Sequence, residues 1–397
     1  MSRPPSANAP TAAGALAPAL QDALARIPMA HSWWVALSGG LDSLLLLHAL
    51  ARWRVANPAP PLHAIHVHHG LRPDADAWAT HCAAECARLG IPLHTARVIV
   101  ERGGQGVEQA ARAARYHAFA EHLPEGALLL VAQHQDDQAE TQLYRLVRGA
   151  GVQGLAGMPL QRPLGRGQLY RPWLHLARAQ LQAEAERLGL VWIDDDSNAH
   201  LDYDRNYLRH RVLPALRERW PACASRMARA ADHLRDAARL LDVLASQDLQ
   251  PVRRDAHSLW LAPLRELDAA RQRNLARYWL NSLGLDMPPE AEWAEHWPAL
   301  LNAGEDRQPQ LSGAVWQLRR YRNALYLLPL PFPQPERHAR LRWSSPHARL
   351  RWAGGVLRMQ RAVGGLNWPD GAILEVIARQ GGERLHLQVN GPRRPLK

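Results

Sequence analysis

A glycine-containing hexapeptide near the start of the chain has the residue types of a phosphate-binding turn. It lies between an apolar run over residues 33–37 and a leucine-rich stretch of helical length. Its members are Ser38, Gly39, Gly40, Leu41, Asp42 and Ser43. Two glycines let the backbone approach a ligand closely, and a helix start presents unpaired N–H groups to an anion. We therefore expect a strand, a turn and a helix that bind nucleotide phosphates. A turn without a ligand is the alternative, because these residue types are also common in turns and helix caps.

The chain has a single lysine, Lys397. This excludes the loop type in which a lysine follows the second glycine and contacts the phosphates. Backbone N–H groups, hydroxyls or arginines would have to bind the phosphates instead. The hexapeptide resembles the PP-loop of enzymes that cleave ATP to AMP and pyrophosphate, and this resemblance implies that residues 38–43 bind ATP.

A second polar block over residues 134–137 follows the apolar run that ends at Ala132. If the two apolar runs are parallel strands of one sheet, their carboxyl ends bring this block to the same edge as the glycine turn. Asp137 and Glu140 alone could form a capping box, but His134 and Asp136 would then have no role. Asp136 suits a magnesium ligand or a group that holds a cationic substrate. We predict that the block is functional.

Arginines on a predicted helix supply a third candidate group. Arg112 and Arg115 lie three residues apart and therefore share one helix face. The planar guanidinium group suits phosphate. A solvated basic helix face fits the same spacing equally well.

The elements that must position these residues alternate between short apolar runs and helical patterns. Strands are expected at residues 33–37, 62–67, 93–100, 127–132 and 190–193, and helices at 74–89, 107–122 and 139–147. This alternation predicts an α/β fold with a doubly wound parallel sheet. Ligands of such sheets bind beyond the carboxyl ends of the strands, where the glycine turn lies.

The length of 397 residues predicts two or three domains. We expect a flexible N-terminal segment over residues 1–30, an α/β catalytic domain over 31–215 and a connector helix over 216–250. A helix-rich domain over 251–330 follows, in which residues 315–328 have the pattern of a hairpin. The chain would end in a small β-rich domain over 340–397.

Composition limits the class of protein. The net charge is +11 and nearly all the cations are arginines, as expected of a protein that binds a polyanion. A coding bias could explain the choice of arginine over lysine, but not the excess over acidic residues. Three cysteines are too few for a disulfide framework, and the apolar stretches are short and interrupted by charges. We expect a cytoplasmic protein that does not contact a membrane.

Taken together, these blocks resemble the tRNA(Ile)-lysidine synthase family. The shared motifs occur in order over about 175 residues, and a block from Arg271 to Leu280 extends the resemblance into the second domain. The motifs are SGGLDS from Ser38, HHG from His68, AR-x-x-RY from Ala111, HQDDQAET from His134, RGxGxxGL from Arg148, RP at Arg171, DDSN from Asp195 and RNxLR from Arg205.

The resemblance implies a PP-loop, adenine nucleotide α-hydrolase-like fold and a defined reaction. Free L-lysine would be joined through its ε-amine to C2 of the wobble cytidine in an isoleucine tRNA with a CAU anticodon, while ATP is cleaved to AMP and pyrophosphate. Magnesium would be held near Asp42 and Asp136. The catalytic residues would be His134, Asp136, Asp137, Arg112 and Arg115. The residues implied to bind tRNA are Arg205, Arg209, Arg271, Arg277, Arg319 and Arg320. A homodimer is compatible with the resemblance.

Two features differ from the family pattern. Gln133 stands where the family often has a histidine, which leaves His134 as the expected functional imidazole. The last domain of the family usually continues past a Gly-Glu-Arg-Leu block, which is present here at residues 382–385, whereas this chain stops at Lys397. This second difference would affect the affinity for tRNA.

Three other functions remain open at this level. A tRNA thiolase of the same superfamily would use a cysteine pair, but Cys82 and Cys86 are separated by three residues rather than two. A small-molecule synthetase of the NAD or GMP type would leave the basic C-terminal segments without a role. A non-catalytic tRNA-binding PP-loop protein would be expected to have lost residues of the turn, yet all of them are present.

Overall fold

The computed structural model describes residues 15–70, 74–100, 107–194, 202–304 and, with short gaps, 307–395. The chain divides into two compact units, Met1–Leu240 and Leu241–Lys397.

A six-stranded sheet in the order β3-β2-β1-β4-β6-β5 forms the centre of the first unit. Five of its strands are parallel: β1 (Trp33–Ala36), β2 (Leu62–His68), β3 (Leu93–Arg97), β4 (Leu128–Leu130) and β6 (Gly167–Tyr170). The edge strand β5 (Gln161–Leu164) pairs antiparallel with β6. The predicted α/β class with a doubly wound sheet is confirmed. The β5–β6 hairpin was not predicted, because two four-residue strands give little periodicity.

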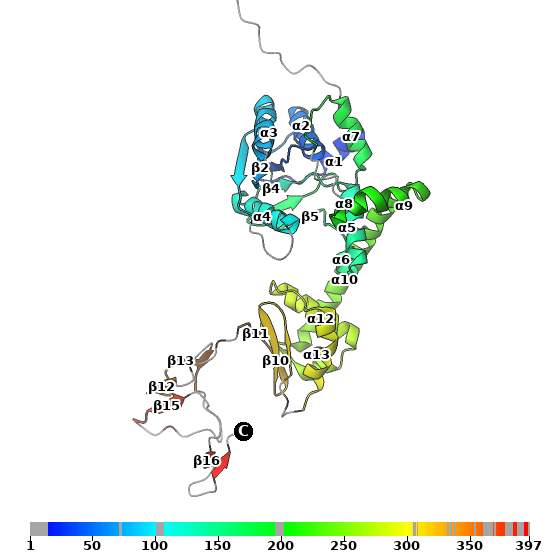
Figure 1. Cartoon of the computed structure of the whole chain (residues 1–397). Coiled ribbons are helices and arrows are strands. Elements are labelled where there is room, and N and C mark those ends of the chain that lie inside the picture. Colours follow the sequence, from blue (N-terminus) through cyan, green and yellow to red (C-terminus); the bar gives the residue numbers. More distant parts are fainter. Residues whose placement is uncertain are drawn as a thin grey trace, which may run out of the picture. The chain divides into compact units, whose positions relative to one another are not determined.

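Side chains of successive strand residues enter two different layers of apolar core. In β4, Leu128 and Leu130 pack into one layer and Leu129 into the other. One layer lies beneath α1 (Pro18–Ala25), α2 (Leu41–Ala56), α3 (Ala75–Leu89) and α7 (Arg178–Arg187), and the other beneath α4 (Val107–His122), as Figure 1 shows. The apolar run of α2 is buried over most of its length, which fixes the start of this helix against β1.

Helix α1 corrects the prediction of a flexible segment over residues 1–30. Leu20 and Leu24 lie four residues apart on one face of this helix, and both are buried in the sheet core. The N–H of Ala17 donates to Oε1 of Glu184 on α7 at 3.1 Å. The ordered domain therefore begins before residue 31, while residues 1–14 lie outside the described part.

The connector helix was predicted over residues 216–250. The structure has two helices in this region. The short helix α9 (Leu213–Arg219) ends near the predicted start, and the 30-residue helix α10 then runs over Cys223–Val252. Early residues of α10, such as Ala224, pack in the first unit, while Leu249 contributes to the core of the second. The long helix therefore supplies core residues to both units.

The second unit contains a five-stranded antiparallel sheet in the order β7-β8-β11-β10-β9. Its strands are β7 (Arg253–Asp255), β8 (Ser258–Trp260), β9 (Gln310–Ser312), β10 (Trp316–Tyr321) and β11 (Ala324–Pro329). The predicted hairpin corresponds to β10 and β11. Strands β7 and β8 were not predicted. They lie at the start of a segment expected to be mainly helical, and three residues each are too few to show a strand pattern.

Three helices complete the core of the second unit. They are α11 (Leu261–Arg265), α12 (Ala269–Ser282) and α13 (Glu290–Asn302). Trp279 is fully buried, and Trp293 stacks on Trp297 with ring centroids 4.1 Å apart. Large aromatic rings fill a core that small strands alone could not enclose.

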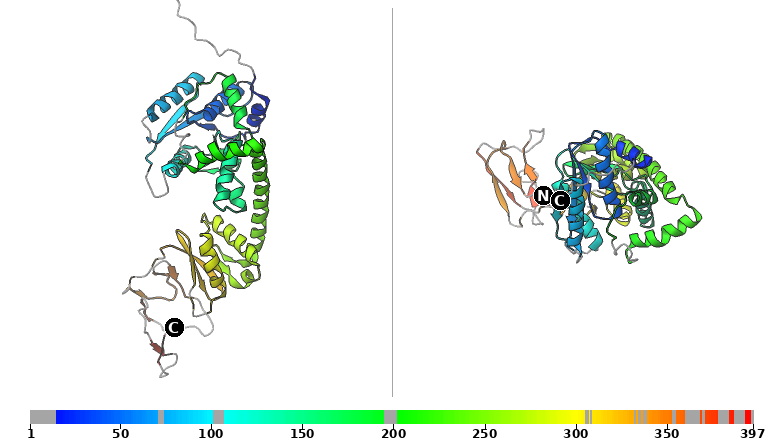
Figure 2. Two further views of the ribbon diagram at one scale, coloured as in Figure 1. Left: turned by 45° about the vertical axis from the view of Figure 1, so that its right-hand side comes forward. Right: turned by 90° about the horizontal axis from the view of Figure 1, so that it is seen from above.

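Short antiparallel strand pairs form the β-rich C-terminal segment (Figure 2). The pairs are β12 (Arg340–Trp343) with β15 (Leu374–Ile377), β13 (Leu350–Trp352) with β14 (Gly355–Leu357), and β16 (Arg384–His386) with β17 (Arg393–Pro395). Within the described ranges, no helix has both the length and the apolar character needed to cross a membrane.

The hairpin turn between β5 and β6 gives a test of the first unit. Gly165 has φ +56°, and a Cβ there would fall on the carbonyl oxygen of Ala120. Gly165→Ala should therefore lower the free energy of unfolding by more than about 2 kcal/mol, since backbone strain and a clash add. Gly189→Ala is the matched control, because its φ is +62° with no atom nearby, and should cost only about 1 kcal/mol. Equal losses in urea denaturation would contradict this packing.

Candidate active site

The glycine turn joins β1 to α2, as predicted. The N–H of Ser38 donates to Oγ of Ser43 at 3.1 Å, and that hydroxyl donates to the carbonyl of Gly40 at 3.1 Å. Gly39 has φ +90°, and a Cβ on it would lie 3.3 Å from Sγ of Cys82. The positive φ favours glycine there, and the tight contact adds to the strain of any larger residue. Leu41 is buried in the core, so among the predicted ATP-binding residues it can offer only its backbone to a ligand.

The segment predicted as a strand over residues 190–193 instead supports this turn. It has no regular secondary structure and lies outside the sheet. The N–H of Ile193 donates to the carbonyl of Gly39 at 3.1 Å. Leu190 and Trp192 pack beside the core while Val191 is exposed, and this alternation explains the strand-like pattern. The DDSN motif that follows at residues 195–198 lies outside the described part.

The second polar block meets the turn because β4 pairs directly with β1 in parallel. His134 is the N-cap of α5 (Gln135–Val147). Its N–H donates to Oδ2 of Asp137 at 3.0 Å, and its Nδ1 accepts from the N–H of Asp137 at 3.4 Å. The capping box therefore joins His134 to Asp137. The prediction that Asp137 and Glu140 could form it is wrong, since Glu140 lies one turn further along the helix.

His134 lies between two carboxylates from different helices. Its Nε2 is 3.7 Å from Oδ2 of Asp42 and 3.5 Å from Oδ2 of Asp137. The side chain is only 3% exposed. Burial alone would lower the pKa of His134, but the charges of Asp137 and Asp42 outweigh it and raise the pKa above its ordinary value. The imidazole therefore retains a proton at higher pH than a free histidine does.

The other oxygen of Asp42, Oδ1, is buried and has no hydrogen-bond partner among the described residues. A buried carboxylate oxygen without a donor is costly, and a bound cation would satisfy it. Asp42 is thus the residue of this site that fits a metal ion.

Arg209 bridges the acidic groups of α5. Its Nε donates to Oε1 of Glu140 at 2.6 Å, and its second amino group donates to Oε2 of Glu140 at 2.9 Å and to Oδ1 of Asp137 at 3.2 Å. Nε of Arg205 lies 3.4 Å from Glu140. Burial would raise the pKa of Asp137, but the charges of His134, Arg205 and Arg209 lower it. Asp137 is consequently held as a carboxylate.

Arg205 and Arg209 were predicted to contact tRNA. The structure places them among these carboxylates, so their first role in the folded chain is to neutralise buried acids. Their contact with tRNA stays a prediction.

Asp136 ties three helices together. Its Oδ2 accepts from the N–H of Arg178 at the start of α7 at 2.9 Å, and its Oδ1 pairs with Arg217 of α9. Both oxygens therefore have donors within the chain. No cluster of three or more potential metal ligands occurs among the described residues. Of the two predicted magnesium ligands, Asp42 has an oxygen without a partner in the part of the chain that the structure describes, whereas Asp136 does not. Sequence reasoning did not identify Arg217, because nothing in a basic segment shows which arginine pairs with an acid.

The predicted phosphate-binding arginines lie on the first half of α4. Arg112 and Arg115 are both exposed. The guanidinium carbon of Arg112 is 5.0 Å from the centre of the Tyr116 ring, and that of Arg162 is also 5.0 Å from it. Cation and ring attract each other in this geometry. Arg112 is therefore oriented by an aromatic ring rather than by a carboxylate, which leaves its charge available to an anion.

The substituted position Gln133 has a structural partner. Its Oε1 accepts from Nε of the buried Arg171 at 2.5 Å, and Arg171 also donates to the carbonyl of Pro159 at 2.7 Å. Burial lowers the pKa of Arg171. The sequence indicated Arg171 only as part of a motif. The structure shows that it binds Gln133, three residues after the end of β4.

The predicted tRNA-binding arginines of the second unit each donate to a group within that unit. Arg271 pairs with Asp248, and Arg277 pairs with Asp242 at 2.5 Å. Arg319 donates to Oε1 of Gln317 at 3.0 Å. Arg320 donates to carbonyls at the end of α13. Their role in tRNA binding also stays a prediction.

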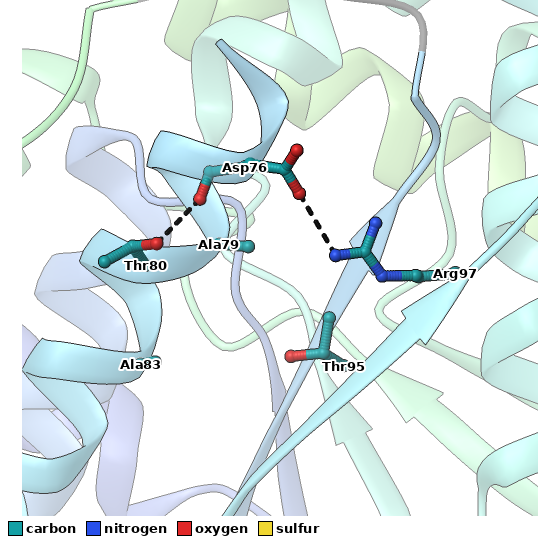
Figure 3. A pocket seen from close by; sticks show the side chains of 6 residues that line it. All are labelled: Asp76, Ala79, Thr80, Ala83, Thr95 and Arg97. Carbon is teal, nitrogen blue, oxygen red and sulfur yellow. Dashed lines mark hydrogen bonds and ion pairs between the residues drawn. The ribbon is translucent and has the colours of Figure 1, made fainter.

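A hollow of about 550 Å³ lies between α3 and β3, apart from the glycine turn (Figure 3). Its charged residues neutralise each other, since Arg97 donates to Oδ1 of Asp76 at 3.0 Å. The hydrogen bond from Arg97 lowers the pKa of Asp76. This hollow contains none of the predicted site residues.

The cysteines lack the features of a sulfur-transfer site. All three are buried and unpaired. Burial raises the pKa of Cys82 to about 12 and that of Cys86 to about 11. Because thiolates are the reactive form, these thiols are poor nucleophiles. The geometry thus disfavours a tRNA thiolase that would use them.

Comparison with known proteins identifies the family. The PP-loop domain family matches residues 15–216, and the TilS substrate binding domain family matches residues 259–326. The chain is 45% identical over 380 residues to the tRNA(Ile)-lysidine synthase of Alkalilimnicola ehrlichii, which covers 94% of this chain and 84% of that relative. This chain belongs to the tRNA(Ile)-lysidine synthase family.

A second relative of the family gives the same result. The tRNA(Ile)-lysidine synthase of Pseudomonas syringae pv. tomato is 45% identical over 388 residues, covering 95% of this chain and 84% of the relative. Among solved structures, the U34-tRNA thiolase NcsA of Methanococcus maripaludis aligns with a TM-score of 0.45 and 17% identity, over 54% of this chain and 77% of that one. That similarity is too low to assign a function. The predicted family is confirmed.

The environment of His134 predicts a pH-dependent contribution to stability. Because folding raises the pKa of His134, its contribution is fully present below the unfolded pKa of about 6.5 and is lost as pH rises through the folded pKa. The free energy that His134→Gln removes should therefore be larger at about pH 6 than at about pH 9, measured by urea denaturation. His117→Gln, on an exposed position, should show a smaller pH difference. A loss that is equal at both pH values would contradict the raised pKa.

Proposed function

We propose that this protein joins free L-lysine to C2 of the wobble cytidine of the isoleucine tRNA with a CAU anticodon, using ATP, so that the tRNA reads AUA as isoleucine. The observation that carries this is the meeting of the glycine turn with His134, between Asp42 and Asp137, in a chain of this family. The PP-loop domain accounts for the use of ATP.

The reaction needs two steps because the C2 oxygen of cytosine is a poor leaving group. That oxygen first attacks the α-phosphate of ATP, and pyrophosphate leaves. The ε-amine of lysine then forms a bond to C2, the C2–O bond breaks, and AMP departs with the oxygen. The cytidine has to leave the stack of the anticodon to reach the site, as in other enzymes that modify bases.

The glycine turn would stabilise the charge that develops on pyrophosphate. Backbone N–H groups at the start of α2 and the positive end of its dipole favour an anion there. The hydroxyls of Ser38 and Ser43, 3.0 Å apart, hold the turn in shape. Arg112 and Arg115 of α4 would supply positive charge. Arg112 forms no ion pair with a carboxylate among the described residues.

Asp42 would hold a magnesium ion through its unpartnered Oδ1. Magnesium at nucleotide sites is commonly bound by one or two carboxylates together with phosphate oxygens. When bound, it neutralises phosphate charge. Asp136 is a weaker ligand in this arrangement, because Arg178 and Arg217 already occupy both of its oxygens.

The attacking amine must lose a proton before it can form a bond. Free lysine has an ε-amine pKa near 10.4, so it is largely protonated at neutral pH. His134 has a raised pKa and lies beside two carboxylates. Only the neutral form of His134 can accept that proton, and in that form its raised pKa makes it a stronger base than a free imidazole. Asp137, kept ionised by Arg205 and Arg209, would attract the ammonium group.

Incorporation of labelled lysine tests the proposed reaction. Wild-type protein with ATP and isoleucine tRNA should incorporate lysine, and Asp42→Ala should lower the rate by on the order of 100-fold or more. Asp22→Ala, at an exposed position of α1, is the control and should retain the wild-type rate. A wild-type protein that binds the tRNA but incorporates no lysine would favour a non-catalytic tRNA-binding protein.

Kinetics of an Arg209 variant can show whether Arg209 positions the active-site carboxylates or contacts tRNA. If Arg209 acts by fixing Asp137 and Glu140, Arg209→Lys should lower kcat by about 10-fold, with little change in the KM for tRNA, because one ammonium cannot replace the two-pronged contact. The kcat profile should also shift with pH, since His134 would lose an ordered neighbour.

The opposite result identifies a different role for Arg209. A higher KM for tRNA with unchanged kcat would show that Arg209 contacts the nucleic acid. Arg54→Lys, an exposed arginine of α2, is the control and should change neither constant.

A further inference from the structure

An apolar groove of about 570 Å³ lies beside the proposed active site, in the first unit. It is formed by α5, α6 (Val152–Leu155), α9 and the first turns of α10. Leu143, Leu216 and Met227 line it, together with Trp220 and Arg226. No acidic residue is among its lining residues.

Large apolar side chains of the groove remain in contact with water. Trp220 is 50% exposed and Leu146 is 56% exposed. The lining also includes Gln142, whose Nε2 donates to the carbonyl of Leu155 at 3.1 Å. Its buried Oε1 has no hydrogen-bond partner. The groove therefore offers an aromatic face and aliphatic walls, which together suit a planar group.

The surrounding charge is strongly positive. Residues 205–229 contain seven arginines and one acidic residue, Glu218. Arg205, Arg209 and Arg217 pair with buried acids of α5. The other four are exposed and, in the described part of the chain, form no ion pair. They are Arg211, Arg219, Arg226 and Arg229. Of these, Arg226 lines the groove and Arg219 precedes the lining residue Trp220. Positive charge at the groove attracts a phosphate backbone.

We propose that this groove binds an unstacked base of the tRNA substrate, stacked on Trp220, with the flanking phosphates contacted by Arg219 and Arg226. Proteins that bind single-stranded RNA combine these two features, an aromatic platform and a basic border. The proposal rests on the proposed function, because it takes isoleucine tRNA as the substrate. A second copy of this chain fits less well, since a symmetric contact would bring the same unpaired arginines together.

The position of the groove indicates which part of the tRNA it receives. Asp137 and Leu146 lie on the same helix, nine residues apart, which corresponds to about 14 Å along its axis. Nine residues are about two and a half turns, so Leu146 also lies on the opposite side of α5 from Asp137. A base in the groove would therefore not be adjacent to the cytidine at the site, and the expected occupant is a more distant nucleotide of the anticodon loop.

Kinetics of Trp220 variants test the proposal. Trp220→Ala should raise the KM for tRNA by about 10-fold through loss of stacking, while kcat at saturating tRNA and the KM values for ATP and lysine stay unchanged. Trp220→Phe should lose less, because a ring remains. Val55→Ala, at a highly exposed position of α2, is the control. Trp220→Leu retains apolar surface without a base-stacking ring, so it separates stacking from any loss of stability.

Salt dependence tests the arginines. Arg219→Gln and Arg226→Gln should each weaken tRNA binding and reduce the slope of log K against log salt by about one. Arg54→Gln should leave the slope unchanged. An isolated anticodon stem-loop should compete for wild-type protein about 10-fold better than for Trp220→Ala.

Several results would overturn the proposal. An unchanged KM for tRNA in both Trp220→Ala and Trp220→Leu would exclude stacking in the groove. A change in sedimentation of these variants without a change in KM would show that the groove is a contact between copies of the chain. Failure of the proposed function would look different, since the wild-type protein would then incorporate no lysine while the binding and competition measurements could still be made.

Discussion

The parallel pairing of β1 with β4 is the constraint on which the proposed site depends. It brings the starts of α2 and α5 together at one edge of the sheet, so that Asp42 of the turn faces His134 of the cap. His134 is fixed in that position by its own capping box with Asp137. A backbone device that begins a helix therefore also orients the imidazole. Sheet pairing and helix capping together produce the charge arrangement that raises its pKa.

Concentrating carboxylates at a buried edge is costly, and the following segment offsets that cost. Asp137 and Glu140 would repel each other without compensation. Arg209 contacts both of them, and Arg217 pairs with Asp136. These arginines come from helices that follow the sheet in the chain. The carboxylates at the start of α5 therefore depend on this later segment for their neutralisation, which links the site to the packing of the helices that follow the sheet.

The sequence was sufficient to predict the features that depend on local patterns. Apolar runs bounded by turns gave the parallel strands β1 to β4 but not β6, and the glycine turn was recognisable from Gly39 and its neighbours. Long-range contacts were not predictable, because nothing local distinguishes an arginine that pairs with a distant acid from one that faces solvent. The segment over residues 190–193 has the composition of a strand, yet its partner is the carbonyl of Gly39 rather than a neighbouring strand. Composition records burial, and burial alone does not specify the hydrogen-bond partner.

The same limit separates two kinds of arginine within one basic segment. Arg209 and Arg219 lie ten residues apart and have the same side chain, but only the first has a buried carboxylate within reach. A guanidinium group beside such an acid is bound by the fold, whereas one without an acid retains its charge for an external anion. The excess positive charge of the chain is therefore a poor guide to nucleic-acid contacts until the internal pairs have been subtracted. The arginines of the first unit that have no internal acidic partner among the described residues include Arg219 and Arg226, at the Trp220 groove.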